Sequence, residues 1–321
     1  MNIVNLEYPL SQSVLDEAPA DGQTLAIGDF DGVHLGHREV IGRAVSEGRR
    51  RGLRAAVMTF HPHPREVLGA KAYSSAITPL ARKLELFREI GVDTVYVVSF
   101  TPTLAALPPE AFVNEVLVPL RVKAVSVGFN FTFGHRGLGT SSLLKQLGEG
   151  RYDVDIATPF RIGDERVSST LIREALSFGD AERAAKFLGR PYAVSGDVVA
   201  GDGRGRTIGV PTANLSVDAR TLKPANGVYA VGATIETGPM AGRSLSGVMN
   251  VGFKPTFHSA LPVPTWEVHL FDFEGNLYGE RLAVSFLSRI RDERKFDSVA
   301  ALIEQIGLDI GEARRRTSAR V

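Results

Sequence analysis

The stretch from Thr24 to His37 reads Thr-Leu-Ala-Ile-Gly-Asp-Phe-Asp-Gly-Val-His-Leu-Gly-His. Its first four residues form a β-rich apolar run. Gly28, Gly32 and Gly36 permit a sharp turn after that run. The residues beyond it predict a helix with one apolar stripe, which holds Val40, Ile41, Ala44 and Val45. The stretch therefore predicts a strand, a glycine-rich turn and a helix, the repeating unit of an α/β fold.

The same alternation continues through the first half of the chain. Further strands are expected at Ala55–Phe60, Thr94–Phe100, Ala124–Gly128 and Asp153–Ala157. Helical patterns lie between them at Ala81–Ile90, Pro109–Leu117 and Ser141–Leu147. Strands that alternate with helices favour a parallel sheet with helices on both faces. Such a sheet binds ligands beyond the carboxyl ends of its strands, where the glycine-rich turn lies.

A boundary between two domains is expected near residue 188. Two helices are predicted at Ser169–Leu176 and Asp180–Leu188, with Asp180 as the cap of the second. Gly-Arg-Pro at 189–191 then breaks the pattern. We therefore expect an α/β domain at 1–188 and a second domain at 189–321.

The second half reads as an antiparallel β-barrel or sandwich. Short strand-like runs separated by turn residues are expected at Ala193–Val199, Gly227–Ile235, Leu245–Val251, Thr265–Phe273 and Leu282–Leu287. A closing helix is predicted at Asp297–Ile306, with Asp297 as its cap. The tail from Arg314 onward is expected to be solvated and loose.

Composition excludes several classes of function. The chain has 321 residues, 44% of them apolar, and a formal net charge of +1. This balance provides a core but no global attraction to nucleic acid or to a membrane surface, so neither is expected as a partner. The chain contains no cysteine, which excludes disulfides, iron–sulfur clusters and thiolate zinc sites. Without a signal peptide or a long apolar run, a cytoplasmic protein with small-molecule substrates is expected; a homo-oligomer remains open.

Two histidines flank Gly36 at the start of the predicted helix. Their three-residue spacing puts His34 and His37 on one helix face, and a helix N-terminus already favours anions. Imidazoles there can donate to phosphate oxygens as charge builds in a transition state. A simple cap or surface pair is the plainer interpretation. Zinc is a further alternative, because His61 and His63 follow the second strand.

Two later segments suit the same chemistry. Gly128–Gly134 reads Gly-Phe-Asn-Phe-Thr-Phe-Gly after a strand. It is either an aromatic plug in the core, or a place where Asn130 bonds a nucleotide or flavin edge. Arg166–Arg173 reads Arg-Val-Ser-Ser-Thr-Leu-Ile-Arg and opens a helix. Ser168 and Ser169 suit ordinary capping, but hydroxyls and arginines at a helix start also suit a triphosphate.

These motifs resemble those of the nucleotidylyltransferase superfamily. They are most similar to the adenylyltransferase module of the bacterial bifunctional riboflavin kinase/FAD synthetase family, through Gly28–His37, Gly128–Gly134 and Arg166–Arg173. The resemblance implies a Rossmann-like parallel sheet that transfers AMP from ATP to FMN, without a covalent enzyme intermediate. It makes His34 and His37 catalytic. It implies ATP contacts at Gly28, Asp29, Phe30, His34, His37, Asn130, Arg166, Ser168, Ser169, Thr170 and Arg173.

The second half carries another candidate phosphate site. The glycine-rich loop at 201–209 is either an ordinary turn or a wrap for a triphosphate; it fits neither a Walker loop nor a dinucleotide fingerprint. Thr212 and Asn214 offer the hard oxygen ligands that Mg²⁺ prefers. Glu267 can accept the proton of an alcohol, or it is merely the exposed residue of an alternating strand.

This half resembles the riboflavin kinase module of the same family. The matching segments are 201–214, Asn226–Ala230, Asn250–Thr256, Glu267–Asp272, Leu277–Gly279 and Arg289–Arg291. The resemblance implies a six-stranded barrel that moves the γ-phosphoryl of ATP to the ribityl 5′ hydroxyl of riboflavin. Thr212 and Asn214 would hold Mg²⁺, Glu267 would be the base beside the flavin, and Arg291 would lie near the flavin. The implied ATP contacts of the kinase are Gly201, Gly203, Gly205, Arg206, Thr212 and Asn214.

The match is not complete, and two other functions remain open. Lys254 stands where arginine is more common, and the segment 257–264 matches no motif. A transferase acting on another phosphorylated acceptor would need only the first site, so Glu267 and the Pro-Thr-Ala-Asn segment argue against it. A flavin-binding sensor would be expected to lack one of the phosphate-binding groups, and none is missing.

Overall fold

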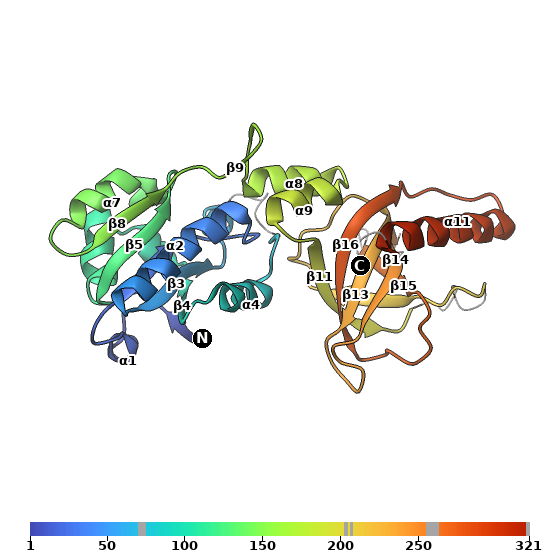
Figure 1. Cartoon of the computed structure of the whole chain (residues 1–321), viewed down its shortest axis with the longest axis horizontal. Helices are drawn as coiled ribbons and strands as arrows, with labels where there is room; N and C mark the ends of the chain where they lie inside the picture. Colours follow the sequence, from blue (N-terminus) through green and yellow to red (C-terminus); the bar gives the residue numbers. More distant parts are fainter. Residues whose placement is uncertain (70–74, 202–204, 206–207, 255–262, 319–321) are drawn as a thin grey trace. The chain divides into compact units, whose positions relative to one another are not determined.

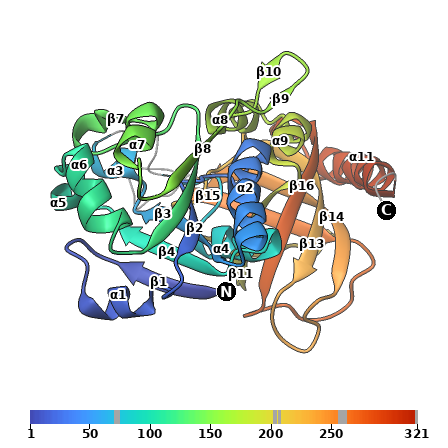
Figure 2. The ribbon, with the colours of Figure 1, turned by 60° about the vertical axis from the view of Figure 1, so that its left-hand side comes forward.

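The computed structural model describes residues 1–69, 75–201, 205, 208–254 and 263–318. The chain forms two compact units, Met1–Ser169 and Thr170–Val321. The first is an α/β unit and the second is built around a β-barrel (Figures 1 and 2).

The α/β unit is organised by one six-stranded sheet. Its strands lie in the order β1-β4-β3-β2-β5-β8 and all neighbours pair in parallel. The chain moves outward from β2 through β3 to β4 and then crosses back to β5, so the order reverses beside β2. The sheet strands are β1 (Asn2–Leu6), β2 (Gln23–Ile27), β3 (Arg54–His61), β4 (Thr94–Ser99), β5 (Val122–Gly128) and β8 (Asp153–Ala157).

Helices cover both faces of this sheet, because its strands are apolar on both sides. Ile41 of α2 and Phe87 of α4 share one buried cluster with Val57 of β3. The next residue along β3, Met58, points to the opposite face and shares a second cluster with Leu117 of the π-helical turn η2. The helices of this unit are α1 (Gln12–Glu17), α2 (Leu35–Arg51), α3 (Pro64–Val67), α4 (Leu80–Ile90), α5 (Pro102–Ala105), α6 (Pro109–Phe112), η2 (Val113–Leu117), η3 (His135–Gly137) and α7 (Ser141–Leu147). Short two-residue strands complete it: β6 (Thr132–Phe133), β7 (Gly139–Thr140), β9 (Arg161–Ile162) and β10 (Glu165–Arg166).

The expected parallel sheet is confirmed, and all five expected strands form within it. The three helical patterns between them also form, the one at 109–117 as α6 followed by η2. An additional strand, β1, was not predicted; it pairs with β4 from Asn2↔Thr94 to Leu6↔Val98. Only Val4 and Leu6 of β1 are buried, so its apolar signal is too short to stand out.

The second unit is a closed antiparallel barrel preceded by two helices, α8 (Ser169–Ser177) and α9 (Ala181–Leu188). Asp180 caps α9 as expected, accepting a hydrogen bond from the Arg183 amide. The strands close in the order β11-β12-β15-β14-β13-β16. They are β11 (Tyr192–Val199), β12 (Ala213–Val217), β13 (Gly227–Ile235), β14 (Ser244–Lys254), β15 (Val263–Leu270) and β16 (Arg281–Arg291). Of these, β12 was not expected, because it starts inside the Pro-Thr-Ala-Asn motif.

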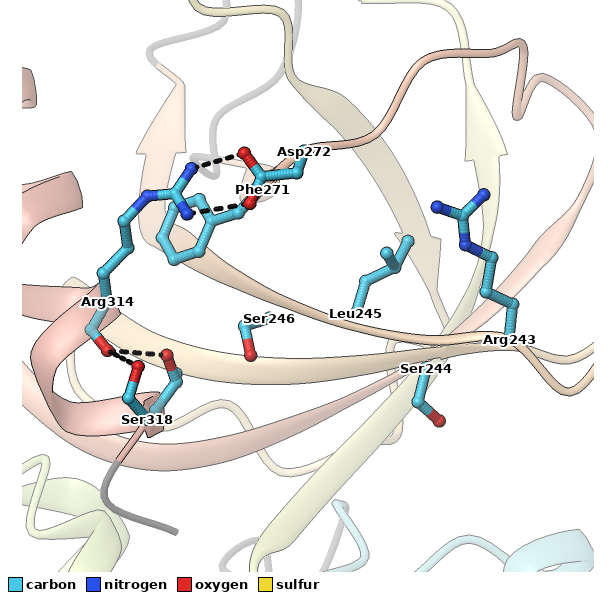
Figure 3. A pocket seen from close by; sticks show the side chains of 9 residues that line it. Arg243, Ser244, Leu245, Ser246, Phe271, Asp272, Arg314 and Ser318 are labelled. Carbon is cyan, nitrogen blue, oxygen red and sulfur yellow. Dashed lines mark hydrogen bonds and ion pairs between the residues drawn. The ribbon is translucent and has the colours of Figure 1, made fainter. Parts of the chain in front are cut away.

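The closing helix corrects three predictions. It is α11 (Val299–Ser318), twelve residues longer at its C-terminal end than the expected Ile306. Ser298, not Asp297, provides the cap, because its hydroxyl accepts from the Ala301 amide. The tail is not loose as far as Ser318: Arg314 forms a bidentate pair with Asp272 across a polar surface pocket (Figure 3).

The expected domain boundary at 188/189 stays a prediction. The two compact units divide earlier, between Ser169 and Thr170. Within the second unit, α8 is bonded to the barrel side through the Ala225 amide, which donates to the Leu176 carbonyl.

Two candidate nucleotide sites

The first candidate site is the turn between β2 and α2. His34 caps α2: its Nδ1 accepts a hydrogen bond of 3.2 Å from the His37 amide. The cap fixes the tautomer, so a neutral His34 carries its proton on Nε2. The two imidazole rings stack with centroids 3.5 Å apart. An ideal Cβ at Gly36 would lie 3.2 Å from the His34 ring, so glycine gives that ring its room.

His37 is held uncharged in this turn. Burial lowers the pKa of His37 well below its ordinary range, and electrostatic interactions with His34 and Lys83 lower that pKa further. The edge of the Phe30 ring system also meets the His37 ring, with centroids 5.3 Å apart. A neutral imidazole can still donate from one nitrogen to a phosphate oxygen.

The backbone of the turn is strained where a ligand would approach. Phe30 and Val33 have φ values of 56° and 40°, although neither is glycine. Such conformations cost of order 1–3 kcal/mol each and cluster at ligand-binding sites. The turn is pinned from outside: the Asp31 carboxylate accepts from the Thr78 amide, and the Asp31 carbonyl accepts from the Ser169 hydroxyl at 2.9 Å. This contact brings one predicted ATP contact, Ser169, to the histidine turn.

Two buried polar atoms of the turn have no hydrogen-bond partner within the described part of the chain. They are Asp29 Oδ1 and His37 Nδ1. A buried polar atom without a partner is costly, and its presence indicates a ligand, an ion or a water at that point. Both atoms belong to residues predicted to contact ATP.

A second group of predicted contacts gathers after β5, next to β2 in the sheet. The Asn130 side chain folds back over Gly128, with its Oδ1 3.4 Å from an ideal Cβ there. The Arg166 guanidinium lies over the exposed Phe129 ring, 5.5 Å from its centroid. An arginine stacked on an exposed aromatic ring at a sheet's carboxyl edge offers both a flat surface and a positive charge.

The remaining first-site residues are placed less completely. Gly28 directly follows β2, and Ser168 precedes α8. Thr170 and Arg173 lie on α8 within the second compact unit, so their part in the first site stays a prediction.

The zinc arrangement left open by the sequence does not form in the described ranges. No group of three or more histidine, aspartate or glutamate side chains there is placed to hold a metal ion. Instead, His63 Nε2 lies 3.3 Å from Asp29 Oδ2.

The second candidate site is a row of side chains across three barrel strands. Asn214 of β12 is opposite Glu267 of β15, and Glu267 is opposite Asn250 of β14. Directly opposed residues of antiparallel strands point to one face. Trp266 and Val268 are buried inside the barrel, while Glu267 lies half-buried on the other face. Asn250 belongs to one of the segments that resemble the kinase module, but no role was predicted for it.

The glycine-rich loop reaches this row. A Cβ at Gly201 would overlap the Asn214 amide, and one at Gly205 would lie 3.2 Å from Thr212 Oγ1. Glycine is therefore required for the loop to pass this closely. The His269 ring holds the strand entry by a 2.8 Å hydrogen bond between Nδ1 and the Pro211 carbonyl. Gly203, Arg206 and residues 257–262 lie outside the described residues.

Two residues of this row, together with Thr212 just before β12, offer a donor set that fits magnesium. Thr212 contributes a hydroxyl, Asn214 an amide oxygen and Glu267 a carboxylate, all hard oxygen ligands. Gly201 and Gly205 pass close to two of these side chains, Asn214 and Thr212. An octahedral ion could be held there by one or two of these groups together with phosphate oxygens.

Arg291, the predicted flavin contact, is engaged elsewhere in this structure. Its guanidinium pairs with Asp309 of α11, from Nε at 2.9 Å and from Nη2 at 2.7 Å, and its Nη1 donates to the Asp292 carbonyl. Gln305 donates to the same carboxylate. Arg291 thus anchors α11 to β16, and its role toward a flavin stays a prediction.

Comparison with known proteins assigns each half. The FAD synthetase family model matches residues 16–171, and the riboflavin kinase family model matches residues 188–317. A bifunctional riboflavin kinase/FMN adenylyltransferase of Bacillus subtilis is 42% identical over 98% of both chains. Another from Escherichia coli is 40% identical over 92% of this chain and 93% of its own.

A solved structure agrees over the whole chain. The crystal structure of a protein named macrolide-efflux protein from Streptococcus pneumoniae has a TM-score of 0.85 and 32% identity, covering 97% of this chain and 99% of its own. Within the described residues of the present chain, no helix has the length and apolar character to cross a membrane. The chain belongs to the family of bifunctional riboflavin kinases/FMN adenylyltransferases.

Proposed function

We propose that this chain makes FMN at the barrel and FAD at the α/β unit, using one ATP at each. The observation that supports the proposal is the match of each half to its own family model, with one candidate phosphate site in each fold. One site has stacked histidines at a helix N-terminus. The other has a carboxylate beside hard oxygen donors.

At the barrel, riboflavin is the phosphoryl acceptor. Glu267 accepts the proton of the ribityl 5′ hydroxyl while the hydroxyl oxygen attacks the γ-phosphorus of ATP. The bond from that phosphorus to the bridging oxygen breaks, and ADP leaves. Asn250 flanks Glu267 and can orient the hydroxyl. Bound Mg²⁺, held through Thr212 and Asn214, would neutralise charge on the phosphates.

At the α/β unit, the phosphate of FMN is the nucleophile. One of its oxygens attacks the α-phosphorus of ATP, and the bond to the β-phosphate oxygen breaks to release pyrophosphate. His34 and His37 donate to phosphate oxygens in the transition state. Asn130, Arg166 and Ser169 position the nucleotide, so the catalysis is orientation together with charge stabilisation.

One incubation tests both assignments. The protein is supplied with riboflavin, ATP and Mg²⁺, and the flavins are separated; FMN and FAD should both form. Glu267→Ala should stop FMN formation and leave FAD formation from supplied FMN intact. The pair His37→Ala and Ser169→Ala should do the reverse. Loss of both activities from either folded variant would contradict the two-site assignment.

A further inference from the structure

A lysine is buried beneath the histidine turn. Lys83 lies on α4 and is 6% exposed. Buried lysines are rare, because an ammonium loses much hydration energy on leaving water. The carboxylate oxygen Asp29 Oδ2 lies 3.9 Å from Lys83 Nζ, too far for a hydrogen bond.

The ammonium is instead bonded to the backbone of the turn. Lys83 Nζ donates to the Asp29 carbonyl at 2.7 Å. The Thr59 hydroxyl, from β3, donates to the same carbonyl at 2.8 Å. One peptide oxygen at the start of the turn is therefore held by two donors that come from different elements.

The helix itself does not need this lysine for packing. Leu86 and Phe87 of α4 are fully buried and anchor it to the sheet. The neighbouring Arg82 is exposed and pairs with Glu85 and Glu89 along the helix surface. An apolar residue at 83 would bury as well and would avoid the desolvation cost.

We propose that Lys83 is a positioning residue for the adenylyl transfer: it fixes the Asp29 peptide, and its charge lies under the turn that receives the triphosphate. This role rests on the function proposed above for the α/β unit. Asp29 follows Gly28 directly, and its carbonyl precedes Phe30, the first strained residue of the turn. Release of that carbonyl would allow the strained turn to relax away from the geometry that His34 and His37 require.

The same charge acts on His37. After burial, the groups that lower the pKa of His37 are His34, which caps the same helix, and Lys83 from α4. Asp29 lies beside Lys83, and His63 lies beside Asp29. Removal of the Lys83 charge should therefore raise the pKa of His37, while burial keeps that pKa below its ordinary value.

The test compares Lys83→Met with Arg82→Met, its exposed neighbour on the same helix. FAD formation from supplied FMN should fall about 10-fold to 100-fold in kcat for Lys83→Met, since a hydrogen bond from a charged group is lost. It should be unchanged for Arg82→Met. Riboflavin phosphorylation by the same preparations serves as the internal control and should be unchanged in both variants.

A second measurement separates positioning from mere support of the fold. The His37 ring is titrated by NMR, assigned with His37→Gln, and its pKa should rise in Lys83→Met only. A fall in kcat without that rise would overturn the inference, as would a wild-type rate. If Lys83→Met does not fold, Thr59→Val removes the second donor to the same carbonyl. Reduced FAD formation in that variant supports the inference and a wild-type rate overturns it. Absence of FAD formation by the unmodified chain would instead refute the proposed function.

Discussion

The anchor between α11 and the barrel gives a quantitative prediction. Asp309 is 5% exposed at its side chain, and Arg291, its partner, is 20% exposed. Removal of one member of a buried pair costs about 3–5 kcal/mol, because the other charge is left without its partner. Since Arg291 keeps some contact with water, we expect the lower end, about 3 kcal/mol. Asp309→Asn, which preserves the side-chain shape, should therefore destabilise the barrel unit by about this amount.

The chain offers a selective probe for this measurement. Its only tryptophan, Trp266, lies inside the barrel beside Phe286, so tryptophan fluorescence reports unfolding of the barrel. A loss of about 3 kcal/mol should lower the urea midpoint by about 1–3 M, given a slope of about 1–3 kcal/mol/M.

A second ion pair that α11 makes with the barrel unit provides the control. Arg314 of α11 makes a bidentate pair with Asp272, but the Asp272 side chain is 76% exposed. Exposed pairs contribute little because water already solvates both groups. Asp272→Asn should leave the midpoint unchanged. Equal shifts for Asp309→Asn and Asp272→Asn would refute the argument that burial sets the cost.

Two further predictions concern the sites. Gly201→Ala should displace the Asn214 amide and reduce riboflavin phosphorylation about 10-fold or more, while FAD formation from supplied FMN is unaffected. Separation of the flavins after timed incubations measures both rates. An undiminished kinase rate would contradict the close approach of Gly201 to Asn214. His37 has a lowered folded-state pKa, so the unfolded chain takes up a proton first, and stability of the α/β unit should fall as the pH drops below about 6.5. Thermal melts followed by circular dichroism at two pH values should show a smaller pH dependence for His37→Gln; an identical dependence would exclude His37 as its source.

Strong local patterns made much of the fold predictable. The apolar run Thr94–Ser99 and the apolar stripe of α2 each predict the correct type of element from a few residues. The elements that the sequence analysis missed depend on distant partners. β1 is completed by β4, about ninety residues away, and β12 buries only Leu215 clearly. Their residues carry too little burial to give a pattern of their own.

The length of α11 was missed for a related reason. Residues beyond Ile306 include Gly307 and Gly311, which lower helix propensity. The helix continues because tertiary contacts hold it, through Asp309 to Arg291 and through Arg314 to Asp272. Contacts of this kind outweigh local preference, and a single sequence does not display them.

The candidate site residues were predictable where they belong to sequence motifs. A residue outside the motifs that only the fold brings to the site was not predictable. The three-residue spacing of His34 and His37 predicted that they lie together, and their rings stack in the structure. Lys83 sits in a helix with charged neighbours, Arg82 and Glu85, so its pattern is that of a surface lysine. Only the fold shows that its side chain turns inward to the Asp29 carbonyl.

The unexpected strand β1 also protects the edge of β4 from pairing with other molecules. It occupies the outer side of β4, whose residues Val95, Val97 and Val98 are strongly apolar. Without β1, β4 would be an unpaired apolar edge strand. It could then pair with β4 of another molecule and start β-sheet aggregation. A truncated chain that starts at Ser11 is therefore expected to aggregate during refolding, although it keeps the residues of both candidate sites.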